Sequence, residues 1–401
     1  MATLIDSPYA WRRLAASVSL STMGGIGMWC LPVALPSVQA DLGVSRADIS
    51  LAYSMNMLGF FAGGVAIGPL VDRRGIVPVS ILSAIGIATG FALAPTTSML
   101  MLFAAAQVLI GFSAAATFAP LVADISHWFE KRRGVAVAIA ASGNYIAGAV
   151  WPPIVELLVR DHGWRATYLA IAAFCLVTMV PLALMLKRRA PDHAEAGASA
   201  VARQSLASLG LSPNALQALL IVAGISCCVA MSMPQVHIVA YCADLGYGVA
   251  RGAEMLSLML GFGIVSRIAS GWLADRVGGV MTLLIGSTLQ CLALVFYLVD
   301  DSLASLYVAS ALFGLFQGGI VPSYAIIVRE YFPPREAASR VGLAISSTIV
   351  GMALGGWMGG VLFDMTGSYR AAFINGIAWN VLNAAIAWWL LSRQSRRPAA
   401  A

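Results

Sequence analysis

Charged side chains are scarce in this chain. Of its 401 residues only 10% are Asp, Glu, Lys or Arg, whereas 60% are hydrophobic and the mean hydropathy is +0.84. A soluble domain usually carries about 25% charged residues to cover its surface. So few charges exclude a water-soluble globular protein and indicate a chain that lies mostly within a membrane. At about 20 residues per spanning helix, a chain of this length has room for about twelve spans with short loops.

Catalytic and metal-binding patterns are also lacking. Neither Gly-x-Ser-x-Gly nor His-Glu-x-x-His occurs, which argues against an intramembrane hydrolase. The six cysteines lie within or at the ends of apolar runs, without the spacing of a metal site or a disulfide framework. They are typical of small buried side chains in a helix bundle. We therefore expect no enzymatic activity, no metal and no other cofactor.

The basic residues are scattered, which argues against nucleic acid as a partner despite a pI of 9.1. Eighteen of the 24 lysines and arginines fall in one set of alternating loops and the termini, five fall in the opposite set, and Arg267 remains. Cytoplasmic loops carry such an excess of positive charge. The bias predicts a multi-pass protein of the cell (inner) membrane with both termini in the cytoplasm and no cleavable signal peptide.

Twelve apolar runs predict the membrane spans. They lie near residues 14–38, 48–70, 76–97, 99–123, 134–158, 163–186, 213–243, 250–273, 279–299, 302–329, 338–362 and 369–391. The segment between Lys187 and Pro213 is the one long polar break, and its composition is typical of a flexible linker. We therefore predict an all-α integral membrane protein, with one six-helix half over residues 1–190, a cytoplasmic linker over 191–212 and a second half over 213–401.

An internal repeat supports two related halves. The segment GPLVDRRG at residues 68–75 recurs as GWLADRVG at residues 271–278, an offset of 203 positions. The same offset relates Gly111 to Gly314, Arg132 to Arg335 and Gly148 to Gly351, so spans 2, 4 and 5 match spans 8, 10 and 11. Glycines can recur by chance in a membrane protein with 39 of them, but chance does not easily hold one register across three spans. The pattern predicts a parallel repeat of two six-helix halves.

Arg267 is the most informative residue, because it lies within the apolar stretch from Met255 to Leu273. A charge at membrane depth costs a few kcal/mol or more and usually has a function. Arg267 precedes Asp275, at the predicted cytoplasmic surface, by eight residues. That places it about 12 Å deep in a hydrocarbon half-layer of about 15 Å. No acidic residue is predicted at that depth, and the planar guanidinium matches a carboxylate. A structural ion pair, a carbonyl clamp or a snorkelling side chain are the alternatives.

The repeated Gly-x-Leu-x-Asp-Arg-x-Gly segment resembles the signature loop of the major facilitator superfamily, and the resemblance implies that fold for the whole chain. We expect Gly68 to permit close helix packing. We expect Asp72 to pair with Arg132 or Arg133, or to cap the helix of span 11, and so to latch the halves. The alternative is a tight turn that only sets topology. The predicted gating set is Gly68, Asp72, Arg73, Gly75, Arg132, Arg133, Asp275 and Arg276.

A narrower resemblance is to the monocarboxylate transporters and their oxalate/formate antiporter relatives. It is carried by HWFEKRRGVA at residues 127–136, by the prolines at 152 and 153, by GWR at 163–165 and by PQVHIV at 234–239. In that branch an arginine in span 8 binds the substrate carboxylate, and Arg267 occupies the matching position. The resemblance thus implies carriage of a small anion.

The chain departs from that branch at positions that bear on the charge of the substrate and on proton coupling. Gly263 stands where the branch often has a proton-coupling carboxylate, and residues 31–34 (LPVA) lack its cationic residue of span 1. Span 11 has no charge, where oxalate carriers have a lysine. One fixed cation favours a monoanion over a dicarboxylate. His237 and Glu254 are the candidates for proton coupling, which leaves symport, exchange and facilitated diffusion open.

Other polar and aromatic residues at suitable depth are candidates for the substrate pocket, although each could instead pack helices together. Together with Arg267 the predicted substrate-binding set is Asn144, Tyr145, His237, Gln107, Tyr324, Gln317, Trp29 and Tyr241. We leave out Asn375, Asn380 and Asn383, because span 12 is usually peripheral in this fold.

The sequence thus predicts a monomeric secondary active transporter that moves a small organic monoanion (a monocarboxylate) across the lipid bilayer by rocker-switch alternating access, with proton coupling left open. An anion exchanger of the oxalate/formate type and a proton-driven exporter of drugs or metabolites are the alternatives. A sensor that no longer transports is a further one, although such sensors tend to carry an added soluble domain.

Overall fold

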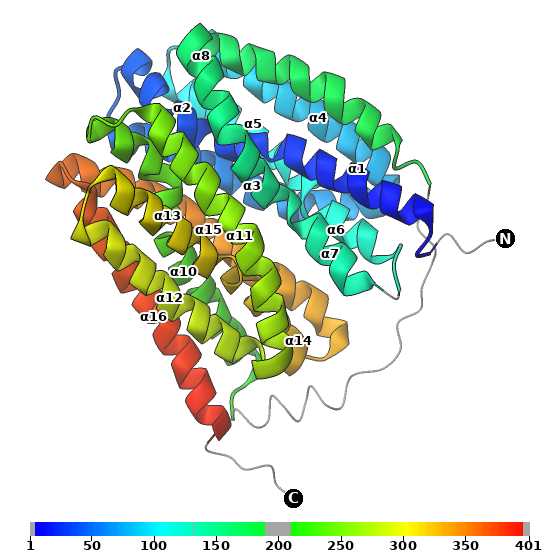
Figure 1. Ribbon diagram of the computed structural model, residues 1–401. Coiled ribbons are helices and arrows are strands. Elements are labelled where there is room, and N and C mark those ends of the chain that lie inside the picture. The colour runs from blue at the N-terminus through cyan, green and yellow to red at the C-terminus, as the bar shows by residue number, and fades with distance from the viewer. Residues whose placement is uncertain (1–4, 131, 189–209, 396–401) are drawn as a thin grey trace, which may run out of the picture. The chain divides into compact units, whose positions relative to one another are not determined.

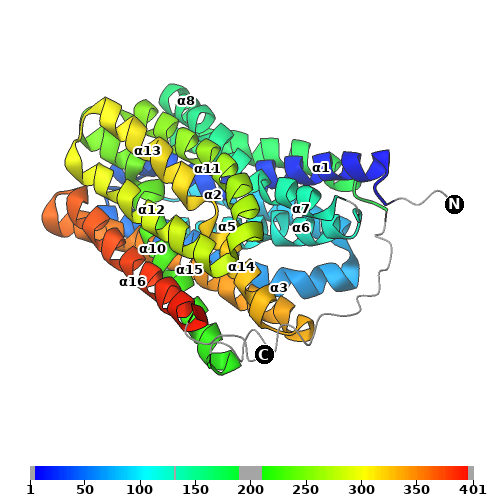
Figure 2. The ribbon, with the colours of Figure 1, turned by 60° about the horizontal axis from the view of Figure 1, so that its bottom comes forward.

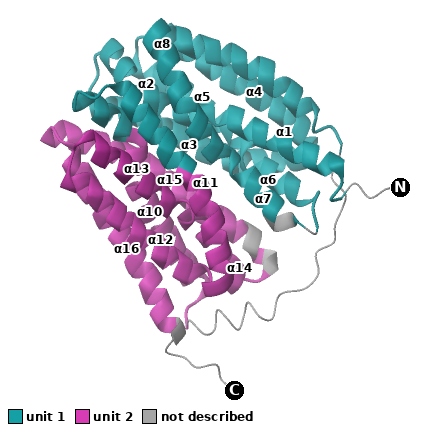
Figure 3. Ribbon diagram, in the orientation of Figure 1, with its two compact units in different colours: residues 1–194, 237–261 teal, residues 195–236, 262–401 magenta. Residues whose placement is uncertain are grey.

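The computed structural model describes residues 5–130, 132–188 and 210–395, and every regular element in these ranges is a helix (Figures 1 and 2). The chain forms two compact units (Figure 3): the first comprises residues 1–194 and 237–261, the second residues 195–236 and 262–401. Most of the predicted linker, residues 191–209, lies outside the described ranges. The predicted boundaries of the two halves stay a prediction.

The helices of residues 5–188 are α1 (Pro8–Gly24), α2 (Ile26–Leu42), α3 (Arg46–Arg74), α4 (Ile76–Leu93), α5 (Leu100–Ala114), α6 (Ala119–Ser126), α7 (Arg133–Ala141) and α8 (Gly143–Leu184), with 3₁₀ turns at Ala94–Thr96 and Ala115–Thr117. Those of residues 210–395 are α10 (Pro213–Asp244), α11 (Val249–Val277), α12 (Gly279–Val299), α13 (Leu303–Gln317), α14 (Ile320–Tyr331), α15 (Pro334–Thr366) and α16 (Tyr369–Ser395).

Eleven helical stretches within the described residues are long and apolar enough to cross a membrane. One of them, Val135–Leu184, holds two spans, because the backbone of α8 leaves helical geometry at Gly163, with φ 78° and ψ 158°. The chain reverses there, near the label α8 (Figure 1). The twelve predicted spans and the all-α fold class are therefore confirmed.

The internal repeat is visible in the backbone. Gly75 has φ 81° and ψ 166°, and Gly278, 203 residues later, has φ 80° and ψ 166°. Residues with a Cβ rarely adopt this geometry, so both turns require glycine. Each of the two glycines immediately precedes a membrane helix, α4 or α12. We call the helix ends beside these glycines, which are predicted to face the cytoplasm, the inner ends, and the opposite ends the outer ends.

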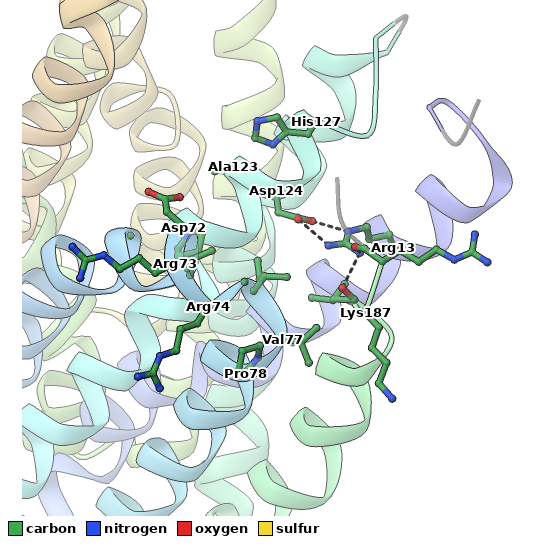
Figure 4. A pocket seen from close by; sticks show the side chains of 17 residues that line it. Arg13, Asp72, Arg73, Arg74, Val77, Pro78, Ala123, Asp124, His127 and Lys187 are labelled. Atoms are coloured by element: carbon green, nitrogen blue, oxygen red, sulfur yellow. Dashed lines mark hydrogen bonds and ion pairs between the residues drawn. The ribbon is translucent and has the colours of Figure 1, made fainter. Parts of the chain in front are cut away.

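Small residues set how closely α3 and α5 pack in the first unit. A Cβ on Gly111 would lie 1.9 Å from the carbonyl oxygen of Asn56, so only glycine allows the two backbones this contact. Gly68 differs, because among the described residues a Cβ there would meet nothing within 4 Å. Gly68 borders the cavity drawn in Figure 4, and the expectation that it permits close helix packing stays a prediction.

Candidate functional site

Arg267 lies on α11, half-buried, beside an interruption of span 10. Helix α13 ends at Gln317 and α14 begins at Ile320, so the backbone between them is turned toward α11. A Cβ on Gly318 would lie 2.3 Å from the carbonyl oxygen of Gly263, and this close approach places the carbonyl of Gly318 3.5 Å from Nε of Arg267. At that length the hydrogen bond is weak. The carbonyl is neutral, so this contact does not compensate the charge of the guanidinium.

Two glutamines lie directly beside this contact. Nε2 of Gln235, on α10, donates to Oε1 of Gln317 at 2.8 Å, and both side chains are buried, at 2% and 0% exposure. Gln317 adjoins Gly318, the residue that Arg267 contacts. The second unit thus brings the predicted residues Arg267 and Gln317 to one place on α11 and α13, together with Gln235 on α10.

Tyr324 belongs to a separate, buried hydrogen-bond network of the second unit. Its hydroxyl donates to Oδ1 of Asn383 at 2.9 Å, and Nδ2 of Asn383 donates to Oγ of Ser287 at 2.6 Å. Nδ2 of Asn380 donates to the carbonyl of Ser287 at 2.9 Å, and both asparagines are fully buried. The sequence analysis left out the asparagines of α16 because span 12 is usually peripheral in this fold, and it therefore missed this network. It joins α12, α14 and α16, and the substrate contact of Tyr324 stays a prediction.

In the first unit the structure joins Trp29 and Asn144. Nε1 of Trp29, on α2, donates to both the main-chain and the side-chain oxygen of Asn144, on α8, each at 3.2 Å. Trp29 is only 3% exposed. Glycine at position 148 leaves room for this ring, because a Cβ there would lie 3.0 Å from Cε2 of Trp29. The neighbouring Tyr145 is buried as well, with 7% exposure.

Gln107 bonds to α3. Nδ2 of Asn56 donates to Oε1 of Gln107 at 3.0 Å and to the carbonyl of Gly27 at 2.9 Å, which ties α2, α3 and α5 together. The side chains of Asn56 and Gln107 are each 1% exposed. The hydrogen bonds give Gln107 a role in helix packing, and its contact with substrate stays a prediction.

The outer ends of α10 and α11, residues 237–261, belong to the first unit. Arg46, at the start of α3, donates from its two terminal nitrogens to the carboxylate of Asp244 at 3.1 and 3.3 Å. Farther along α11, Ser257 Oγ donates to the carbonyl of Ala149 on α8. A Cβ on Gly148 would lie 2.2 Å from Leu260, so this side chain too packs tightly on α8. We call residues 237–261 the outer segment.

The predicted residues His237 and Tyr241 lie in the outer segment, and both are buried, at 0% and 5% exposure. Glu254 is different, because it lies at the surface in an ion pair of 3.0 Å with Arg251, with side chains 44% and 52% exposed. Exposed pairs of this kind are weak. The proton-coupling roles of His237 and Glu254 stay predictions.

The inner end of the first unit holds a buried ion pair that the sequence analysis missed. Nε and Nη2 of Arg13 donate to the two oxygens of Asp124 at 2.7 and 2.8 Å, and the arginine side chain is 1% exposed. Nη1 of Arg13 donates to the carbonyls of Leu186 and Arg188 at 3.0 and 2.9 Å. The pair thus fastens α1 and α6 to the end of α8. The sequence feature that could have indicated this ion pair is a carboxylate, that of Asp124, within the apolar run LVADIS.

The pair predicted between Asp72 and Arg132 is not formed among the described residues, where both side chains are exposed. The side chain of Arg133 lies outside the description, so its part in the latch stays a prediction. In the second unit, Asp275 and Arg276 are exposed too, and the guanidinium of Arg276 stacks over the ring of Trp272 at 3.7 Å.

The GWR segment acts at the outer end of the first unit. After the turn at Gly163, Nε1 of Trp164 donates to Oδ2 of Asp41 at 3.2 Å, and Nη2 of Arg165 donates to the same oxygen at 2.7 Å. Arg165 also donates to the carbonyl of Thr97 at 3.2 Å. The motif therefore clamps the turn within α8 to the end of α2 and to the loop before α5, which is a structural role.

Comparison with known proteins agrees with this architecture. The family model of the Major Facilitator Superfamily matches residues 18–299 and 255–401. The chain belongs to the major facilitator superfamily.

Curated relatives place this transporter near one branch of the superfamily. It is 29% identical over 328 residues to monocarboxylate transporter 13 of Rattus norvegicus, which covers 81% of this chain and 74% of the relative. It is 28% identical over 386 residues to monocarboxylate transporter 11 of Homo sapiens, which covers 92% of this chain and 80% of the relative. The resemblance to the monocarboxylate transporter branch is thereby confirmed.

Solved structures confirm the fold. A bacterial homologue of the human lysosomal transporter Spinster, in an inward-facing and unoccupied conformation, matches with a TM-score of 0.76 at 14% identity, covering 99% of this chain and 100% of that one. A point mutant of the nucleoside transporter NupG matches with a TM-score of 0.75 at 15% identity, covering 96% of this chain and 99% of that one. At these identities the matches show the fold alone.

Proposed function

We propose that this protein is a secondary active transporter that carries a small organic monoanion, a monocarboxylate, through the cell membrane by alternating access, with Arg267 as the anchor of the substrate carboxylate. Its place in the major facilitator superfamily establishes transport in general. The monocarboxylate names of its relatives support the substrate class.

The observation that carries the proposal is the environment of Arg267. Its guanidinium is half-buried in the middle of a membrane helix, with a neutral carbonyl at 3.5 Å as one partner. Charged groups are retained at such depth when they bind a charged ligand or line its path. A carboxylate can accept two parallel hydrogen bonds from the planar guanidinium, which lysine cannot reproduce.

The adjoining glutamine pair supports a small, polar substrate. The bond from Gln235 to Gln317 uses one donor and one acceptor, and each amide has further hydrogen-bonding capacity. We expect these amides to contact substrate oxygens beside the carboxylate. Trp29, Asn144, Tyr145, His237, Gln107, Tyr324 and Tyr241 remain the other proposed contacts.

Charge balance favours one negative charge on the substrate. Span 11, within α15, carries no charged residue between Val341 and Leu362, so the sequence offers no second cation there. In a medium of low dielectric constant, the second carboxylate of a dianion would stay uncompensated. We therefore expect monocarboxylates to be carried in preference to dicarboxylates.

Alternating access requires contacts that form and break. Within the first unit, the outer segment is held to α3 by the pair of Arg46 and Asp244 and to α8 by the contact of Ser257. We propose that these contacts close the outer side of the carrier and that they separate when it opens outward.

The test is uptake of radiolabelled short-chain monocarboxylates into proteoliposomes that contain the full-length protein. We compare the wild type with R267A and R267K, and use R370A as the matched control, because Arg370 is an exposed arginine at the start of α16, away from α11 in the sequence. We expect saturable uptake by the wild type and R370A, and little by either Arg267 variant. Retained uptake by R267A would refute the assignment.

The same vesicles separate the modes of transport. Stimulation by an inward proton gradient identifies symport, and stimulation by unlabelled substrate inside the vesicles identifies exchange. A dicarboxylate that is carried as well as a monocarboxylate would contradict the argument from charge balance. Transport of cationic drugs instead of anions would favour the exporter alternative.

A further inference from the structure

Arg46 differs from the other arginines that are predicted on the outer side. Its side chain is buried, at 7% exposure, whereas Arg160, Arg251 and Arg370 are exposed and Arg165 is half-buried. Arginine is rarely buried unless it is paired with a negative charge. The partner of Arg46 therefore decides what this residue does.

Three donors of the Arg46 guanidinium have acceptors at hydrogen-bonding distance. The two terminal nitrogens donate to the two oxygens of Asp244 at 3.1 and 3.3 Å, and Nε donates to Oε1 of Gln39 at 2.6 Å. Gln39 lies on α2, which is joined to α3 by the short loop of residues 43–45, whereas Asp244 is the last residue of α10. Gln39 can therefore hold the guanidinium in the same orientation when Asp244 moves away.

Both charges of this pair lie at helix ends that disfavour them. Arg46 is the first residue of α3, where the helix dipole is positive, and Asp244 is the last residue of α10, where it is negative. Asp48, in the capping box with Ser45, offsets the dipole at the start of α3. A carboxylate that does not belong to a helix end avoids the unfavourable interaction of Asp244 with α10. Such a carboxylate is therefore a competitive partner for Arg46.

Opening of the outer side takes the carboxylate away from this buried guanidinium. Under the proposed function, the outer segment separates from α3 at that step, and Asp244 moves with it. A buried charge that loses its partner is costly, and the neutral amide of Gln39 does not compensate it. A carboxylate from solution offers the same two oxygens in the same planar arrangement. By taking the place of Asp244, it would lower the free energy of the open state.

We propose that Arg46 is a docking site for the substrate carboxylate at the outer end of the first unit, where the substrate replaces Asp244 during outward opening. The inference rests on the proposed function and deepens it, because external substrate then favours the opening of the outer side. Arg46 is a positioning residue in this account. Chloride does not match the site, because a spherical ion lacks the paired oxygens that the planar guanidinium binds.

The experiment measures binding to the full-length protein in detergent by saturation-transfer difference NMR. The probe is propanoate, and its neutral amide, propanamide, is the control. All the proteins carry R267A, so the binding does not depend on Arg267. We expect R267A/D244N to bind propanoate at least about tenfold more tightly than R267A, because Asp244 no longer competes for Arg46. R267A/D161N is the matched control, because it removes a carboxylate from an exposed pair with Arg160, and it should stay within about twofold of R267A.

Adding R46Q to R267A/D244N separates docking from opening. Both proteins lack the pair of Arg46 and Asp244, and they differ only in the presence of the guanidinium. We expect R46Q to abolish the gain in affinity. Binding of propanoate by R267A/D244N no tighter than by R267A/D161N would overturn the proposal, as would a gain that survives R46Q or that propanamide shares.

A second measurement leaves the pair intact and covers the case in which D244N does not fold. A cysteine introduced by A149C, beside the contact of Ser257 with α8, is labelled with a maleimide in equal concentrations of sodium propanoate or sodium chloride. We expect propanoate to raise the labelling rate at least about threefold over chloride, with or without R267A. Equal rates in the two salts would overturn docking at Arg46, whereas the proposed function is tested separately by the uptake of R267A.

Discussion

Replacing Asp124 by asparagine should strongly destabilise the protein. The wild-type carboxylate accepts bonds of 2.7 and 2.8 Å from Arg13, whose side chain is 1% exposed. Asparagine keeps one acceptor but removes the negative charge, so the buried guanidinium loses its counter-ion. Breaking a buried pair in this way costs about 3–5 kcal/mol.

Two features place the expected cost at about 3 kcal/mol, near the lower limit of that range. Asp124 is itself 12% exposed and borders the cavity, so water can partly solvate the remaining charge. Arg13 also keeps its bonds to the carbonyls of Leu186 and Arg188 and its stacking over Trp128 at 4.5 Å. In a chain of 401 residues a loss of this size lowers the Tm by about 3–5 °C.

The assay is thermal unfolding of the purified protein in one detergent, followed by intrinsic tryptophan fluorescence. The matched control is E254Q, which breaks the exposed pair with Arg251 and should change the free energy of unfolding by about 0–1 kcal/mol. In a double-mutant cycle, R13M combined with D124N should cost less than the sum of the two single changes. A D124N protein as stable as E254Q, or strictly additive changes, would refute the reasoning.

Three further predictions concern other contacts. G111A should destabilise the protein by about 1–3 kcal/mol in the same thermal assay, because its Cβ would meet the backbone of Asn56. G68A should leave the stability unchanged, because its Cβ would meet nothing within 4 Å. Equal effects of the two variants would contradict the packing argument. D244N should release the outer segment and so raise the rate at which a membrane-impermeant maleimide labels a cysteine introduced by A149C. Each 1 kcal/mol lost from the free energy of the Arg46–Asp244 pair should raise this rate about fivefold. An unchanged rate would argue against the pair as an outer closure. Y324F should lower the free energy of unfolding by about 1–2 kcal/mol, because buried Asn383 loses its donor, and a variant as stable as the wild type would remove the support for that network.

The sequence was sufficient to predict features that depend on one unusual residue, one recurring motif or the hydropathy of one segment. Arg267 stands out because arginine is rare at membrane depth, and Gly75 and Gly278 stand out because one motif recurs at a fixed offset. The twelve spans follow from hydropathy, which depends only on neighbouring residues. The two spans within α8 were separated correctly because the charged break at residues 160–162 lies between two apolar runs, next to the turn at Gly163.

Contacts between distant segments could not be predicted in this way. Arg13 and Asp124 are 111 positions apart, and the sequence indicates that Asp124 needs a partner but not which of 24 basic residues provides it. The same holds for Arg46 with Asp244 and for Tyr324 with Asn383. Gly68 shows a different difficulty, since a small residue can border open space as readily as a close contact.

The central claim is that Arg267 holds the carboxylate of the substrate. Its most direct test is equilibrium binding of a radiolabelled monocarboxylate, one that the wild type carries, to the purified protein. Loss of the guanidinium should remove about 2–5 kcal/mol, so R267A should bind more than about thirtyfold more weakly than the wild type, while R370A binds normally. Binding by R267A within about threefold of the wild type would contradict the account.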